Sequence, residues 1–203
     1  MSTKGLDRIA QNEASVRAHL TKLGINSLSD IAEIPFDTIQ EVRTAHDGKS
    51  LEIGAEYNPE RLDAFGFDNE IRFHRFLTLV PLLVVVADVI LGFTNKSTYF
   101  WGVLFAAIGF FGTGQRNTNA GLLGGVGIMV IIGLALAGNW PWVVVIGSLV
   151  VSVTAVSLAK GMYVEHIKAK ALHSEILFCH MFLNRIITLR SAGTQQYIIP
   201  PKG

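Results

Sequence analysis

Apolar residues follow one another with little interruption from Phe76 to Ala159, and this tract dominates the pattern of the chain. The only charged residues inside it are Asp88, Lys96 and Arg116. A helix that crosses a bilayer needs about 20 apolar residues, with a range of about 17–25. Clusters of polar and turn-forming residues divide the tract into shorter runs. The runs expected to cross are Phe76–Phe93, Tyr99–Gly112, Ala120–Gly138 and Trp142–Ala159. The pattern predicts a transmembrane domain of about four helices over residues 76–160, with the second run short for a full crossing.

Basic residues on both sides of this tract predict its orientation. Arg61, Arg72 and Arg75 precede it, and Lys160, Lys168 and Lys170 follow it. Loops rich in Lys and Arg stay on the cytoplasmic side. We therefore expect a multi-pass protein of the inner (plasma) membrane, with both termini in the cytoplasm and an even number of spans.

The segment before the tract has helical periodicity. Apolar residues recur at three- and four-residue steps over 4–23, and shorter helices are expected near 28–34 and 38–45. Their apolar residues would close a small helical core, formed by Leu23, Ile25, Leu28, Ile31, Ile34, Phe36, Ile39 and Val42. Residues 1–57 are thus predicted to be a cytosolic helical interaction module, and 58–75 an amphipathic juxtamembrane segment.

The segment after the tract has a similar pattern. Met162–Arg190 contains neither proline nor glycine and mixes charged with apolar residues, which favours one long amphipathic helix. Residues 161–203 are therefore predicted to be a cytosolic amphipathic helix followed by an extended tail. The fold class expected for the whole chain is all-α, a multi-pass α-helical membrane protein.

Charge and cysteine content narrow the classes of partner. Residues 1–75 hold nine Lys and Arg against thirteen Asp and Glu, while residues 76–203 hold eight against three. An acidic amino-terminal part argues against nucleic acid as a partner. The single cysteine, Cys179, excludes an internal disulfide.

Asp88 is the one acid among the predicted spans. A carboxylate near the centre of a transmembrane helix costs about 2.5–3.5 kcal/mol on insertion scales, so such a group is usually paired or functional. Ser148 is expected at a matched depth in the last span. One interpretation is a protonated or water-contacting Asp88 that bonds Ser148 or a backbone carbonyl. The other is an ion or proton site.

Small residues in the third apolar run suggest close helix packing. Gly121 and Gly125 form a G-x-x-x-G pair, and Gly133 and Ala137 form a looser version. Such pairs let helix backbones approach closely in lipid. The contact could lie within the chain or between copies of it.

Three histidines are spaced seven residues apart. His166, His173 and His180 would line one stripe of a continuous helix. Seven residues span about 10 Å along the helix axis, so the three cannot share one metal ion. The stripe is expected to be a polar seam or, in an oligomer, a pH-sensitive one.

The motifs of common enzymes are missing from the sequence. It contains no phosphate-binding loop, dinucleotide fingerprint, zinc-protease helix, nucleophile elbow or cysteine pair. We therefore expect no catalytic residues, metal or cofactor. The predicted function is a non-enzymatic interaction or assembly subunit of a membrane complex, as in secretion, conjugation or exclusion machinery. Its partners would be the lipid bilayer and other membrane proteins or further copies of itself. The alternative is a small oligomeric channel or transporter with Asp88 on the ion or proton path.

Overall fold

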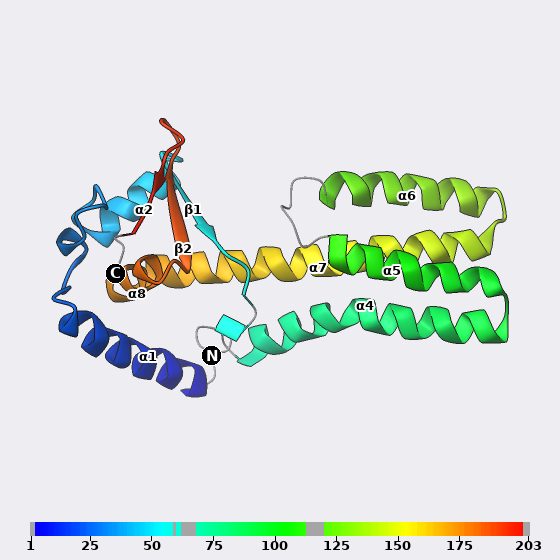
Figure 1. The fold of residues 1–203 in the computed structure, drawn as a ribbon, viewed down its shortest axis with the longest axis horizontal. Coiled ribbons are helices and arrows are strands. Elements are labelled where there is room, and N and C mark those ends of the chain that lie inside the picture. Colours follow the sequence, from blue (N-terminus) through cyan, green and yellow to red (C-terminus); the bar gives the residue numbers. More distant parts are fainter. Residues whose placement is uncertain (1–2, 59, 62–67, 113–119, 201–203) are drawn as a thin grey trace. The chain divides into compact units, whose positions relative to one another are not determined.

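The computed structural model describes residues 3–58, 60–61, 68–112 and 120–200 (Figure 1). The chain forms two compact units. Unit 1 comprises Met1–Ile71 and Tyr163–Gly203, and unit 2 comprises Arg72–Met162. The segments before and after the apolar tract therefore fold together into one unit.

The amino-terminal helices of unit 1 follow local signals in the sequence. Helix α1 covers Thr3–Lys22, and the left-handed Gly24 (φ 77°) follows its end. A short 3₁₀ helix, η1, covers Leu28–Asp30. Helix α2 (Ile39–Asp47) begins at Thr38, whose hydroxyl oxygen accepts a hydrogen bond from the backbone N–H of Glu41.

A small antiparallel sheet corrects the all-α prediction. It contains β1 (Leu51–Ala55), β2 (Ile187–Ser191) and β3 (Tyr197–Ile198), in the order β1-β2-β3. Leu51 pairs with Ser191 and Ala55 with Ile187, so β1 and β2 lie side by side (Figure 1). Alternate residues of both strands point into the core, which is the two-residue period of a half-buried strand. The chain is mostly helical, with a little sheet.

The prediction of one long helix over Met162–Arg190 is also wrong. Helix α7 (Trp140–His173) ends before Ser174, whose extended backbone (φ −135°, ψ 130°) separates it from α8 (Glu175–Leu183). After α8, Arg185 adopts the left-handed conformation (φ 55°), and Ile186 N–H donates to the Met181 carbonyl at 2.8 Å. This turn resembles a glycine C-cap but is made without glycine, so the sequence carried no obvious stop signal.

The core of unit 1 combines residues from both ends of the chain. The amino-terminal residues Leu28, Ile31, Ile34 and Val42 are buried, as expected, whereas Leu23 is 57% exposed. Ile25, Phe36 and Ile39 are partly buried against the core. The carboxyl-terminal part of this core consists of Tyr163, Ile167, Ala171, Leu177, Phe178, Cys179, Met181, Phe182, Ile186, Ile187 and Leu189. The amino-terminal segment therefore does not close a core of its own.

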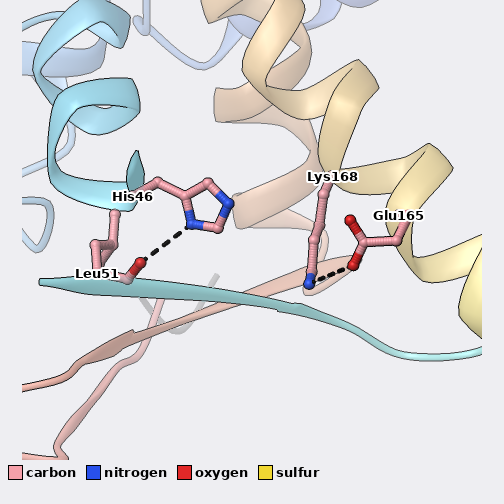
Figure 2. A network of polar contacts seen from close by, with 4 residues as sticks. All are labelled: His46, Leu51, Glu165 and Lys168. Carbon is pink, nitrogen blue, oxygen red and sulfur yellow. Dashed lines mark hydrogen bonds and ion pairs between the residues drawn. The ribbon is translucent and has the colours of Figure 1, made fainter. Parts of the chain in front are cut away.

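Polar contacts add to this packing at the surface of unit 1. Nδ1 of His46, on α2, lies 3.2 Å from the carbonyl oxygen of Leu51, at the start of β1. Lys168 donates to Glu165 on α7 at 2.9 Å, and Figure 2 shows both contacts. An exposed ion pair such as the second stabilises little.

Unit 2 is built from apolar helices. They are α4 (Asp68–Thr94, whose first residues belong to unit 1), α5 (Phe100–Gly112), α6 (Ala120–Leu136) and the first part of α7. A further 3₁₀ turn, η2 (Ser97–Tyr99), precedes α5. Two stretches are long and apolar enough to cross a membrane, Asn69–Thr94 and Trp140–His173. Helix α5, with 13 residues, is too short for a straight crossing, and α6, with 17, is at the lower limit. The expected count of four spans is thus not confirmed.

The apolar side chains of unit 2 are largely exposed. Only 17% of the most apolar window of α4 is buried within the protein, and 39% of that of α7. The core helix of a water-soluble domain has its apolar residues mostly covered. The exposed residues of α4 include Phe76, Leu79, Leu82, Leu83, Val86 and Ile90. This distribution is suited to a lipid environment.

Candidate functional site

Asp88 lies inside unit 2, where it is 1% exposed. It comes from α4, and Ser148 of α7, 5% exposed, lies next to it. The Ser148 hydroxyl and Asp88 Oδ1 form a hydrogen bond of 3.0 Å. The structure therefore brings together the two residues that the sequence placed at matched depth, and their functional role stays a prediction.

The second carboxyl oxygen of Asp88 faces α5. Within the part of the chain that the structure describes, Oδ2 is buried and has no hydrogen-bond partner. A Cβ atom built on Gly102 would lie 2.5 Å from this oxygen. The backbone of α5 thus passes directly against the carboxyl group, and any side chain at position 102 would displace it.

Ser148 and Ser152 extend this polar line along α7. Ser148 Oγ also lies 3.0 Å from the carbonyl oxygen of Val144, one turn earlier. Ser152, one turn later, is 0% exposed, and among the described residues its hydroxyl has no partner. A buried carboxyl and hydroxyls in apolar surroundings can hold a proton or a small cation.

Of the small residues singled out in the sequence, Gly125, Gly133 and Ala137 do not make close helix contacts within the described residues. A Cβ atom built on Gly125 or Gly133 meets nothing within 4 Å, and Ala137 is exposed. Gly121 lies on α6, and its surroundings are outside what the structure describes. Their role in packing, including packing against another chain, stays a prediction.

Other glycines allow the helices of unit 2 to approach closely. A Cβ at Gly109 would lie 2.9 Å from the Cβ of Ser152, which places α5 against α7. A Cβ at Gly127 would overlap the side chain of Val150, which places α6 against α7. Like Gly102, they are positions at which a side chain would collide with the neighbouring helix.

The three spaced histidines do not line one helix. The continuous helix assumed for them is interrupted at Ser174, so that His166 and His173 lie on α7 and His180 lies on α8. His166 Nδ1 is 3.0 Å from Glu70, and the ring of His180 packs edge-to-face on His19 of α1 at 6.2 Å. The single-helix arrangement is therefore wrong, and a pH-sensitive role for these histidines stays a prediction.

The junction between α7 and α8 is where the amino-terminal elements bond to the carboxyl-terminal part. Arg43 of α2 donates from Nε to the Leu172 carbonyl at 2.7 Å and from Nη2 to the His173 carbonyl at 3.1 Å. Ser174 Oγ donates to Glu13 of α1 at 2.6 Å. Glu175 accepts from the backbone N–H of Leu28 at 2.8 Å. No pattern in the sequence predicted these contacts, because nothing local links positions so far apart along the chain.

A cavity of about 320 Å³ opens beside this junction, between α1 and α8. Arg17 and Glu175 contribute charged groups to its wall, and the buried Cys179 also lines it. The full lining is Arg17, Leu20, Thr21, Ile25, Asn26, Glu175, Ile176 and Cys179. Burial raises the pKa of the Cys179 thiol to about 12, so this cysteine is not a ready nucleophile.

Known proteins offer no guide to this site. No family model matches the chain, and neither the curated proteins nor the solved structures contain a match to it. Within the described ranges, no cluster of three or more His, Cys, Asp or Glu side chains is arranged to hold a metal ion. The candidate sites are therefore the Asp88–Ser148 pair of unit 2 and the α1–α8 cavity of unit 1.

Proposed function

We propose that the protein is a non-enzymatic assembly subunit of a larger membrane complex, held in the bilayer by unit 2 and contacting its partner through unit 1. The observation that carries this proposal is that the segments on both sides of the apolar tract fold into one unit with its own core. This unit also has an open cavity with charged and apolar walls. Anchor side chains of a partner protein fill pockets in the surface that they bind, and this cavity offers such a pocket.

The test is recovery of the tagged full chain from native membranes after mild cross-linking. We expect a defined partner, or further copies of the same chain, to be recovered with it. Thr21→Arg would fill the mouth of the cavity and reduce recovery several-fold. Ala18→Arg adds the same side chain at an exposed position of α1 outside the cavity, so recovery should be unchanged. A chain recovered alone, as a monomer, would contradict the proposal.

We further propose that both termini lie on the cytoplasmic side of the inner membrane and that the apolar tract crosses four times. The basic flanks of the tract support the first statement. The exposed apolar side chains of α5 and α6 support the second. Tags at each terminus should be protected from protease in intact cells and cleaved in opened ones. Cleavage of either tag in intact cells would disprove the layout.

A second candidate function is that of a small oligomeric channel or transporter. The observation that favours it is the buried Asp88, with one oxygen left without a partner among the described residues. Ion or proton flux into liposomes should fall at least tenfold in Asp88→Asn. Ser157→Ala, which removes a buried hydroxyl elsewhere on α7, serves as the control. Equal flux in the parent and Asp88→Asn would exclude this function.

A further inference from the structure

The contacts of the Ser148 hydroxyl indicate whether Asp88 carries a proton. The hydroxyl oxygen lies 3.0 Å from Asp88 Oδ1 and 3.0 Å from the Val144 carbonyl oxygen. A hydroxyl has one proton to donate, and a backbone carbonyl can only accept. If Asp88 were ionised it could also only accept, and Ser148 would face two acceptors with one proton. A protonated Asp88 removes the conflict, because it donates to Ser148, which then donates to Val144.

The surroundings of Asp88 also favour the neutral acid. Helices α5 and α6 carry no charged residue over their described lengths. On α7 the first charge is Lys160, about 18 Å along the axis from Ser148. On α4 the titratable residues before Asp88 are Arg75, His74, Arg72, Glu70 and Asp68, and the nearest of them, Arg75, is about 20 Å away along the axis. Lys96 is the nearest charge along the chain, but it follows the end of α4 and its side chain is exposed.

Burial makes the lack of a nearby counter-charge among the described residues decisive. Oδ2 is enclosed against the backbone of α5 at Gly102 and, within the described residues, accepts no hydrogen bond. An isolated ionised carboxylate in apolar surroundings costs so much that the group takes up a proton instead. The carbonyl oxygen of a neutral acid tolerates a missing partner far better than a charged oxygen does.

We propose that Asp88 is a proton-binding site. At neutral pH it holds one proton in the chain Asp88 O–H to Ser148 O–H to the Val144 carbonyl, and this chain ties α4 to α7. The site goes beyond the proposed assembly role. It requires neither a partner nor transport, and its failure would leave that role untouched.

Infrared spectroscopy of the full chain in lipid nanodiscs tests the site directly. At pH 7 we expect the parent, but not Asp88→Asn, to show the carbonyl stretch of a protonated carboxylic acid. Ser148→Ala keeps the acid but removes its acceptor, so the band should remain and move to higher frequency. Circular dichroism confirms that each variant is folded.

Two results would overturn the proposal. One is that the parent and Asp88→Asn match in the protonated-acid region, while the carboxylate band is weaker in Asp88→Asn than in the parent. Asp88 would then be ionised in the parent. The other is a band at the same frequency in the parent and in Ser148→Ala, since the acid would then not bond Ser148. If Asp88→Asn does not fold, the parent and Ser148→Ala decide alone, and lack of the band in both refutes the site.

Discussion

The importance of each glycine in unit 2 depends on which atoms a side chain at its position would meet. Gly102 faces the carboxyl group of Asp88, and Gly109 faces α7 at Ser152. Gly125 belongs to the most conspicuous glycine motif of the chain, yet a side chain there would meet open space. Sequence spacing alone could not distinguish these positions, because both kinds of glycine lie in equally apolar helices.

This contrast predicts opposite outcomes for the same substitution. Gly102→Ala places a methyl group 2.5 Å from the Asp88 carboxyl, well inside van der Waals contact, and should destabilise the protein by about 1–3 kcal/mol. Gly125→Ala should be neutral or stabilise by up to about 1 kcal/mol, since alanine favours the helix. Unfolding in detergent, followed by circular dichroism, measures both. Equal effects of the two changes would contradict the packing described.

Cys179 is predicted to be unreactive in the folded protein. Its side chain is buried, and burial raises its pKa to about 12, so almost no thiolate is present at pH 7.5. Alkylation by iodoacetamide, followed by mass spectrometry, should be at least a hundredfold slower than in denaturant. An exposed cysteine, Ala18→Cys in a Cys179→Ala background, provides the control and should react at the rate of a free thiol. Fast labelling of native Cys179 would show that α1 and α8 separate readily.

At the scale of elements, the end of α7 depends on residues from the other end of the chain. The last carbonyls of a helix have no partner within it. Those of Leu172 and His173 accept from the Arg43 guanidinium. Its positive charge also suits the negative end of the helix dipole. The short helix α2 therefore supplies the C-terminal cap of α7.

Removal of this cap should be costly. Arg43→Ala leaves two carbonyls without their donor and should lower the free energy of unfolding by about 1.5–3 kcal/mol. Arg43→Lys should recover only part of the loss, because a lysine cannot donate two bonds from a planar fork. Lys22→Ala, which removes an exposed charge from α1, should change stability by less than about 0.5 kcal/mol. Denaturant unfolding compares the three, and full rescue by lysine would rule out the two-bond arrangement.

At the scale of the whole molecule, the two units distribute polarity in opposite ways. Unit 1 buries its apolar residues in a common core, whereas unit 2 exposes them and keeps Asp88, Ser148 and Ser152 inside. Water favours the first arrangement and hydrocarbon the second. Unit 1 also holds the half-buried histidine His180, so its stability should respond to the pH of the solution.

His180 predicts the direction of that response. Burial and the neighbouring His19 lower the pKa of His180 below its ordinary value of 6.5. Between pH 6.5 and the lowered pKa, the unfolded chain binds more protons than the folded one. Stability should therefore fall as the pH drops from about 6.5 toward the lowered pKa. Below that value both states are protonated, and the loss stops increasing.

The measurement is thermal unfolding of the full chain at pH values from 7.5 to 5. The parent should lose stability across this range, and His180→Gln should flatten the slope. Asp30 does not interfere, because the backbone N–H groups of Asn26 and Ser27 lower its pKa below 3.8, and its contribution is lost only in stronger acid. A slope unchanged by His180→Gln would assign the effect to another group.

Local patterns predicted much of the secondary structure. The helix over 4–23, the helix near 38–45 and the apolar tract were all visible in the sequence, because each depends on neighbours within a few residues. The strands were missed although Leu51 and Ile53 alternate with polar residues. Strands of five residues are too short for periodicity to distinguish from a helix, and Ile186 and Leu189 also fit a three-residue helical step.

The sequence by itself determined where apolar residues are concentrated and which local segments favour helix. Hydrophobicity and helix propensity are properties of residues and of their close neighbours in the chain, so no knowledge of the fold is needed to see them. Only the tertiary structure decided that β1 pairs with β2, that Arg43 caps α7, and that Gly102 closes over Asp88. Each of these contacts joins residues that the sequence leaves far apart, and their energies exist only once folding has brought the atoms within reach.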